Sequence, residues 1–205
     1  STTKPTDPTQ TNPNTGAESP KTGAESPKTG DNNHSDFPQI GTIIKDAAGI
    51  FYYQITGTDT VEVKNMTAKG KRKKAVKIFK TIKVNGRTLK VTGIAANAFK
   101  GNKKMTSVTI GSNVKTIGSG AFMNCRNLTR VTVTAKGLTS IGKNAFKGDR
   151  KLKTVNLRKV KALKKVGKGA FQGISKKVTV KVPKQKKKAY SKLLKKAGIA
   201  AGRIK

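Results

Sequence analysis

Few side chains in this sequence have the chemistry of a catalytic centre. The chain holds one histidine, His34, and one cysteine, Cys125, and neither has a catalytic partner nearby in the sequence. From Phe37 onward the carboxylates are Asp46, Asp59, Glu62 and Asp149. A catalytic triad or a zinc site needs several such residues together, and a glycosidase needs two facing carboxylates, which this spacing does not supply. We therefore expect no enzymatic activity, no cofactor and no metal site.

Cys125 is interpreted as a structural residue. It lacks a local base, and it falls at a repeat position where a small, half-buried side chain fits. A thiol in such surroundings behaves as a small apolar filler and not as a nucleophile. Because it is the only cysteine, an internal disulfide framework is also excluded.

Cations dominate the sequence. Lys and Arg number 45 against nine Asp and Glu, which gives a formal net charge of +36. Residues 1–36 hold three of the basic and five of the acidic residues, so 42 basic and four acidic residues remain from Phe37 onward. A body with this charge attracts anions, and the candidate partners are nucleic acid, acidic lipid surfaces and acidic polymers outside a cell. Charge by itself does not rank these three classes.

An internal repeat must position these cations. An Ala-Phe pair recurs at Phe99, Phe122, Phe146 and Phe171, at intervals of 23, 24 and 25 residues, which is the period of a solenoid. Nine and eleven residues after each Phe an aliphatic pair follows, the pattern of a strand with one buried face. We expect four rungs whose strands pair in parallel about 4.8 Å apart. Each rung should have an inward Ile or Val, a Gly that permits a tight bend, and Ala-Phe on a short helical turn.

The repeat places cations at equivalent positions just before each predicted strand. Stacked rungs would align them at about 5 Å intervals along one edge of the sheet. We name this array the basic column, and it comprises Lys103, Lys104, Arg126, Arg150, Lys151, Lys176 and Lys177. Its expected ligand is a linear polyanion. The alternative is that lysine is simply the solubilising surface residue of this protein, because Lys71–Lys74 and Lys184–Lys188 are equally basic and lie outside the column.

The outward strand positions form a second candidate surface, the strand face. Its residues are mostly polar side chains that suit β-structure and can hydrogen-bond a partner. The strand face comprises Thr109, Arg130, Thr132, Thr154, Asn156, Thr179 and Lys181. Sequence-tolerant binding of single-stranded nucleic acid usually stacks bases on exposed aromatic side chains. The strand face has none, so we expect no specific nucleic acid.

The chain divides into a tail, two caps and the repeats. The boundaries are 1–39 for the tail, 40–90 for an N-terminal β cap, 91–183 for the repeats and 184–205 for a C-terminal helical cap. The tail is rich in Thr, Pro, Ser and Gly and repeats the heptad TGAESPK, which predicts a disordered stalk or linker. Apolar residues at helical spacing after Pro183 predict a helix that covers the last rung.

The N-terminal cap is predicted from strand and turn signals. Runs rich in β-branched and aromatic residues predict strands over 50–56, 60–66 and 76–84. Asn85-Gly86 supplies the two positive φ angles of a type I′ turn, so a hairpin is expected over 81–91. This cap should cover the open end of the first rung.

Three stretches of the repeat resemble a known family. They are TIGSGAFMNCRNLTRVTV at Thr116–Val133, SIGKNAFKGDRKLKTVNL at Ser140–Leu157 and VPKQKKKAYSKLL at Val182–Leu194. The chain resembles BspA-type leucine-rich repeat proteins, and it is similar to the Lys-rich C-terminal modules of surface proteins from gut Firmicutes. The resemblance implies an α/β, leucine-rich-repeat-like right-handed solenoid with a parallel β-sheet, a bacterial surface location often linked with adhesion, and no shared catalytic residues.

The sequence departs from the family pattern at two positions of the repeat. The Gly that follows Ile is Ala95 in the first rung. The Cys position is occupied by Asn102, Asp149 and Ile174 in three of the four rungs. End rungs are expected to be atypical, so these departures leave the fold intact but remove any special role for Cys125.

We expect a non-enzymatic binding or adhesion module of a secreted bacterial cell-surface protein. Its expected partner is a host or bacterial surface protein, or an acidic polymer such as wall phosphopolymer or sulfated glycan. Two alternatives stay open, a basic module that attaches to acidic polymers of the cell's own envelope and an intracellular nucleic-acid binder. No stretch approaches the roughly 18 apolar residues of a membrane span. No signal peptide remains at Ser1, so we expect targeting and anchoring segments outside this chain.

Overall fold

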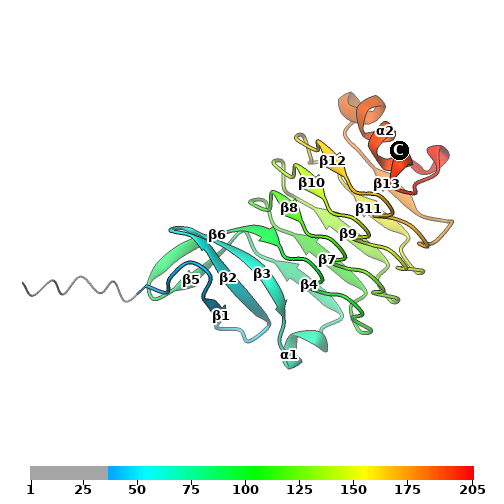
Figure 1. Ribbon diagram of the computed structural model, residues 1–205. Helices are drawn as coiled ribbons and strands as arrows, with labels where there is room; N and C mark the ends of the chain where they lie inside the picture. The colour runs from blue at the N-terminus through cyan, green and yellow to red at the C-terminus, as the bar shows by residue number, and fades with distance from the viewer. Residues whose placement is uncertain (1–36) are drawn as a thin grey trace, which may run out of the picture. The chain divides into compact units, whose positions relative to one another are not determined.

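Each repeat contributes one strand to each of two β-sheets, so the rungs stack as a two-sheeted solenoid (Figure 1). This computed structural model describes residues 37–205, and the predicted stalk over 1–39 lies outside that range except for its last three residues. One hydrophobic core runs between the sheets from the N-terminal strands to the C-terminal helix. The expected leucine-rich-repeat-like solenoid with parallel strands is confirmed.

The five-stranded sheet is parallel throughout and holds the Val-x-Val type strands predicted from the repeat. Its order is β13-β11-β9-β7-β4. The strands are β4 (Ala75–Ile78), β7 (Ser107–Ile110), β9 (Arg130–Val133), β11 (Thr154–Asn156) and β13 (Thr179–Lys181). Every strand has a buried central Val that pairs in register with the Val of its neighbour. Stacking in this register buries aliphatic surface that no isolated rung could cover.

The eight-stranded sheet joins the N-terminal cap to a short parallel strand from each rung. Its order is β1-β2-β3-β6-β8-β10-β12, and β5 pairs with β6. The strands are β1 (Ile43–Lys45), β2 (Phe51–Gly57), β3 (Thr60–Met66), β5 (Thr81–Val84), β6 (Arg87–Ile94), β8 (Thr116–Ile117), β10 (Ser140–Ile141) and β12 (Lys165–Val166). The inward Ile or Val of each repeat thus ends a strand of this second sheet. Ile94 ends the eight-residue β6, and Ile117, Ile141 and Val166 end two-residue strands that the sequence did not predict.

The phenylalanines of the repeat form one continuous stack through the core. Their ring centroids lie 4.8, 5.0 and 5.2 Å apart, with the ring planes within 5° of parallel. The stacked residues are Phe99, Phe122, Phe146 and Phe171, all nearly inaccessible to solvent. They lie on turns, not on short helices, and the turns themselves are bonded between rungs, as where Phe122 N–H donates to Ala145 O at 2.7 Å. The prediction that these residues are core is confirmed.

The glycine after each inward Ile or Val is required for a different reason from the predicted tight bend. A Cβ on Gly142 would lie 2.5 Å from the amide nitrogen of Ser119 in the preceding rung. The other two glycines at this repeat position have equally close backbone neighbours. The glycine therefore permits adjacent rungs to approach each other. Ala95 of the first rung faces strand β3 instead, where its N–H donates to Val63 O at 2.9 Å.

The N-terminal cap differs from its prediction in the strand expected over 76–84, and it also contains strand β1 and a short helix at Ala68–Lys71, which the sequence did not predict. The hairpin is confirmed, because β5 and β6 pair antiparallel around Asn85 and Gly86, whose φ angles are 46° and 76°. The single strand expected over 76–84 is wrong, because the chain leaves the extended conformation at Phe79 and Lys80 and passes from one sheet to the other. Strand β4 is consequently part of the solenoid and pairs in parallel with β7.

The C-terminal helix covers the last rung as predicted. Helix α2 (Lys187–Lys196) follows a 3-10 turn at Lys184–Lys186 and precedes another at Ala201–Arg203. Tyr190 is buried, and its hydroxyl accepts from Leu163 N–H at 3.0 Å and donates to Val160 O at 3.3 Å. Phe171 N–H donates to Ala197 O at 2.9 Å, the bond that the other phenylalanines make to the next rung. The end of α2 thus takes the place of a further rung. No helix within residues 37–205 is long and apolar enough to cross a membrane.

Candidate binding surface

The outward side chains of the five-stranded sheet form two rows in register. Ser107 lies opposite Arg130 and Thr109 lies opposite Thr132, and the same register continues through β11 and β13. One row is Ser107, Arg130, Thr154 and Thr179, and the other is Thr109, Thr132, Asn156 and Lys181. All are half-buried except the exposed Arg130. The residues of the strand face therefore lie side by side.

The seven residues of the basic column are all exposed and lie in the loops that precede the strands. Side-chain hydrogen bonds tie these loops together. Asn127 Nδ2 donates to Lys103 O at 2.7 Å, and Lys151 Nζ donates to Asn127 Oδ1 at 2.8 Å. The N–H groups of Arg126 and Arg150 each donate at 2.9 Å to the carbonyl two residues earlier, so both rungs share one turn conformation. Equivalent cations thus recur on successive rungs.

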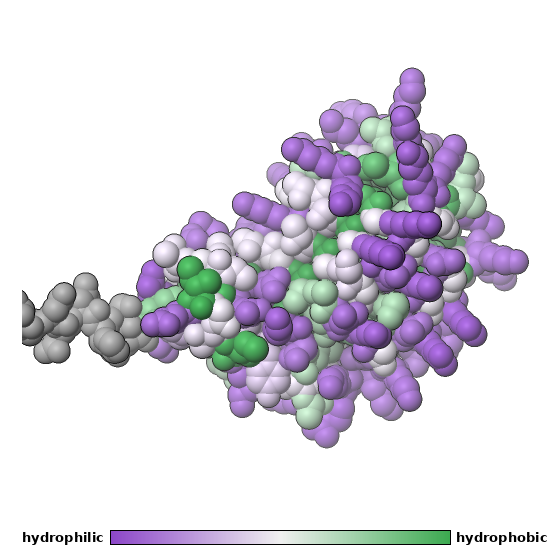
Figure 2. Space-filling model, viewed as in Figure 1, coloured by the Kyte–Doolittle hydropathy of each residue, from purple (hydrophilic) through white to green (hydrophobic). Residues whose placement is uncertain are grey.

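The basic column has no partners of opposite charge within residues 37–205. The single ion pair of that range joins Lys90 Nζ to Asp59 Oδ2 at 2.8 Å in the N-terminal cap. The hydrogen bond and charge of Lys90 lower the pKa of the Asp59 carboxyl. On the face of the molecule seen in Figure 2, the surface is covered largely by hydrophilic side chains, with small hydrophobic areas between them. Neutralisation of the column therefore depends on anions from outside these residues.

Strand β4 adds surface residues that sequence reasoning missed. Ala75 and Lys77 continue the two rows of the strand face opposite Ser107 and Thr109. Lys77 Nζ lies 5.2 Å from the ring centroid of Phe79, a side chain that is 50% exposed. The available signal was the alternation Ala-Val-Lys-Ile, which matches Ser-Val-Thr-Ile of β7. Its interval of 32 residues hid the match, because β5 and β6 lie between the two strands.

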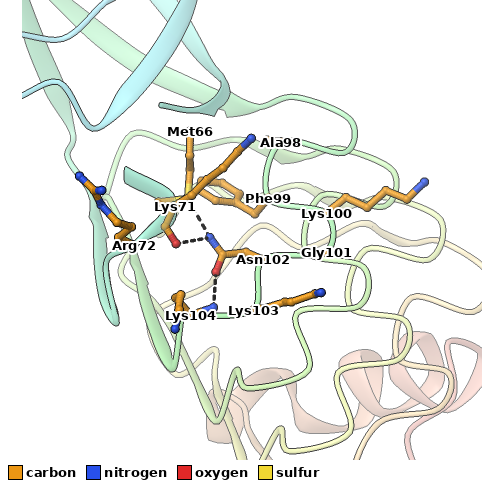
Figure 3. Close-up of a pocket in the computed structure, with 10 residues that line it drawn as sticks. All are labelled: Met66, Lys71, Arg72, Ala98, Phe99, Lys100, Gly101, Asn102, Lys103 and Lys104. Atoms are coloured by element: carbon orange, nitrogen blue, oxygen red, sulfur yellow. Dashed lines mark hydrogen bonds between the residues drawn. The ribbon is translucent and has the colours of Figure 1, made fainter. Parts of the chain in front are cut away.

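A pocket of about 380 Å³ opens at the N-terminal end of the basic column (Figure 3). Its apolar floor is formed by Met66, Ala98 and Phe99. Its rim carries five exposed cations, Lys71, Arg72, Lys100, Lys103 and Lys104. We name this feature the seam pocket, because it lies where the N-terminal cap meets the first rung. Sequence reasoning placed Lys71 only in a basic run outside the basic column.

Helix α1 (Ala68–Lys71) holds Lys71 and Arg72 beside the first rung. Thr67 caps this helix, since its Oγ1 accepts from Gly70 N–H at 3.0 Å and its hydroxyl donates to Gly49 O at 2.6 Å. Gly70 lies so close to the backbone of Ile50 that any Cβ would overlap the Ile50 carbonyl. The short helix is therefore held against the N-terminal cap, so the backbone that carries Lys71 and Arg72 has a fixed position.

Two titratable groups are buried behind the column. The Cys125 thiol donates to Phe99 O at 3.1 Å, and the Cys125 N–H donates to Asp149 Oδ1 at 2.8 Å. Burial, with the neighbouring Asp149 as the smaller cause, raises the pKa of Cys125 to about 12. A thiol that holds its proton at neutral pH is a poor nucleophile, which supports the structural interpretation. Sequence reasoning assigned Asp149 to the same repeat position as Cys125 but did not foresee that it is fully buried.

Stacked parallel rungs, each closed by a Phe turn, define a leucine-rich-repeat solenoid. The sequence model of the BspA type leucine rich repeat region matches six copies over residues 77–200, and the chain belongs to this family. Six copies exceed the four rungs expected from the sequence. The match begins in β4, which has no Ala-Phe pair, and extends through α2, whose end replaces a rung. Proteins of this family are usually interaction modules at bacterial surfaces.

Solved structures share the fold. A leucine-rich repeat protein from Bacteroides capillosus superposes with a TM-score of 0.59 at 22% identity, covering 68% of this chain and 97% of that chain. A leucine-rich repeat protein from Bacteroides ovatus superposes with a TM-score of 0.54 at 29% identity, covering 65% of this chain and 36% of that chain. Among curated proteins, none matches the sequence.

Proposed function

We propose that this chain is a non-enzymatic binding module that holds an acidic polymer, such as a wall phosphopolymer or a sulfated glycan, at a bacterial cell surface. The observation that carries the proposal is the basic column, a set of exposed cations on successive rungs with no carboxylate partner in residues 37–205. Binding of this kind is electrostatic and shows little preference for sugar or sequence.

The column suits a linear polyanion better than a compact one. Its cations recur with the strand spacing of about 4.8 Å, so an extended chain can meet one rung after another. Each charge that is neutralised releases a condensed counterion, which supplies most of the binding free energy. Because Asn127 ties the loops of neighbouring rungs together, the backbone beneath the column is ordered before binding.

Adhesion to a host or bacterial surface protein is the second candidate function. The in-register polar rows of the strand face favour it, because they offer hydrogen-bonding groups over five strands. Nucleic acid is the weaker alternative, because no aromatic side chain interrupts those rows and base stacking is the usual source of sequence-tolerant affinity.

Charge-matched variants test the proposal. The column variant replaces Lys104, Arg126, Lys151 and Lys177 with Gln. The control variant replaces Lys187, Lys188, Lys192 and Lys196, four exposed cations of α2, with Gln. Affinity for a glycerol-phosphate polymer, heparin and single-stranded DNA is measured by calorimetry between about 50 and 200 mM salt. The column variant should lose roughly tenfold more affinity for the first two polymers than the control does.

The salt dependence adds a second readout. Each lost contact should reduce the slope of log K against log salt by roughly 0.7–0.9, so the column variant should have a slope smaller by about 3. Equal losses in the two variants would show that the column is only a solvated surface. A clear preference for single-stranded DNA over both other polymers would favour the nucleic-acid alternative.

A further inference from the structure

The seam pocket arises because the N-terminal cap replaces a rung without copying its shape. Between rungs, the phenylalanine rings stack in parallel at 4.8 to 5.2 Å. At the seam, Phe51 meets Phe99 edge-on instead, at 6.1 Å and an interplanar angle of 83°. The Asn102 amide bridges the gap by donating to Met66 Sδ and Lys71 O, both at 3.4 Å (Figure 3). The cap thus covers the first rung but leaves an open cavity beside it.

The junction between a cap and a rung does not by itself make a pocket as basic as the seam pocket. At the other end of the solenoid, where α2 replaces a rung, a pocket of about 350 Å³ has only Lys176 and Arg203 as cations. The seam pocket gathers five cations, and no carboxylate of residues 37–205 forms an ion pair with any of them. Figure 3 shows the Lys71 side chain crossing above Met66 and Phe99. A concentrated positive rim therefore surrounds an apolar floor.

We propose that the seam pocket binds a single phosphate or sulfate ester group carried on a small organic body. Its volume falls within the range of about 300–1,000 Å³ that is typical of small-molecule sites. A doubly or singly charged oxyanion would gain from several cations at once, and the guanidinium of Arg72 can bond two of its oxygens together. Met66, Ala98 and Phe99 line the base of the cavity but are at most 6% exposed, so the organic body would be covered mainly by the aliphatic stems of the rim lysines.

The phosphate or sulfate ester group that binds in the pocket can belong to either of two kinds of molecule that share this chemistry. It can be a free small molecule, or it can be the terminal group of an acidic chain that continues along the basic column. Lys103 and Lys104 belong to both the pocket and the column, so a chain that begins in the pocket reaches Arg126 on the next rung. Only this second source rests on the proposed function.

The test uses phenyl phosphate, inorganic phosphate and uncharged phenyl glucoside with the full chain at low salt. Affinity is measured by calorimetry, and the site is located by amide chemical shifts. Phenyl phosphate should bind at least fivefold more tightly than inorganic phosphate, with the largest shifts at Gly101 and Asn102, and phenyl glucoside should not bind. A K71Q/R72Q variant should lose about tenfold in affinity for phenyl phosphate. A K187Q/K188Q control, matched in charge, should stay within about twofold of the wild type.

Two results would overturn the pocket proposal. One is equal affinity for phenyl phosphate and inorganic phosphate, and the other is equal loss in the two variants. A phosphate-terminated and a dephosphorylated oligomer of an acidic polymer then separate the sources, because only a terminal group in the pocket makes their affinities differ. Phenyl phosphate is too short to extend along the column, so failure of the column experiment leaves this result unaffected.

Discussion

Asp149 is the one carboxyl of residues 37–205 that lies fully inside the core. Its Oδ1 accepts the Cys125 N–H at 2.8 Å, while its Oδ2 has no hydrogen-bond partner. Burial raises the pKa of this carboxyl to about 9. A charged carboxylate at this position would be desolvated with only the Cys125 N–H to compensate it, so the side chain is protonated at neutral pH.

A raised pKa makes stability depend on pH in a defined direction. The folded protein keeps the Asp149 proton up to about pH 9, whereas the unfolded chain releases it near the ordinary value of 3.8. The contribution of Asp149 to the free energy of unfolding is therefore fully present below pH 3.8 and is lost as pH rises towards 9. The loss is on the order of 1 kcal/mol per pH unit. Asp149→Asn keeps an acceptor for Cys125 N–H and removes the titration, so the variant should be the more stable protein at pH 8.

Urea unfolding at pH 4.5 and pH 8 checks this prediction. Wild type should lose stability between the two pH values, while D149N should change much less. If both proteins show the same pH dependence, the buried carboxyl is not its cause. The other three carboxylates of residues 37–205 are not buried, so they are expected to contribute little.

The rung depends on backbone contact as much as on its buried side chains. A Cβ on Gly142 would meet Ser119 N at 2.5 Å and Gly118 C at 2.6 Å, and neither backbone atom can move without separating two rungs. We expect Gly142→Ala to destabilise the protein by about 1–3 kcal/mol. Gly137→Ala is the matched control, because no atom lies within 4 Å of a Cβ there.

Thermal or denaturant unfolding of the two glycine variants shows whether Gly142 is required for the close approach of adjacent rungs or only for its conformational freedom. G137A should be neutral or slightly stabilising, since alanine restricts the unfolded chain. If instead G142A were as stable as G137A, the rungs would have room to separate. The assignment of this glycine to close backbone approach would then fail.

At the level of elements, repetition explains what could be predicted from the sequence. The positions of Phe122 and Phe146 recur in phase with the Val pairs, so four strands of the five-stranded sheet, with their register and outward rows, could be deduced before the structure. Strand β4 could not, because the β5–β6 hairpin breaks the period. The short strands β8, β10 and β12 carry two residues each, too few to show any alternation.

The two candidate sites also differ in how far they could be predicted from the sequence. The basic column follows from the repeat, since each loop carries its cations at one phase of the period. The seam pocket does not, because Lys71 and Phe99 come from segments whose packing is decided by tertiary contacts between cap and rung. Burial of Asp149 was also hidden, because a carboxylate at a repeat position normally indicates an exposed residue.

The whole molecule carries more positive charge than its own carboxylates can offset. From Phe37 onward 42 basic residues face four acidic ones, and one ion pair forms in that range. Folding brings these cations together, and successive rungs separate their backbones by only about 4.8 Å. That distance is well within the screening length of about 30 Å at 10 mM salt and about 10 Å at 0.1 M. Self-repulsion therefore opposes the folded state, most strongly at low salt.

Salt should consequently stabilise this protein. Raising sodium chloride from about 10 mM to about 0.15 M shortens the screening length, so we expect Tm at pH 7 to rise by several degrees. The variant with Lys104, Arg126, Lys151 and Lys177 replaced by Gln should start from a higher Tm at 10 mM and gain less from salt, because four clustered cations are gone. A short acidic polymer added at 10 mM salt should raise Tm of the wild type further than the same charge supplied as chloride, since it binds only where cations are arrayed. Scanning calorimetry at fixed protein concentration measures all three changes. A Tm that is flat or falls with salt would mean that the cations lie too far apart to repel one another, and the basic column would then not be a concentrated array of charge.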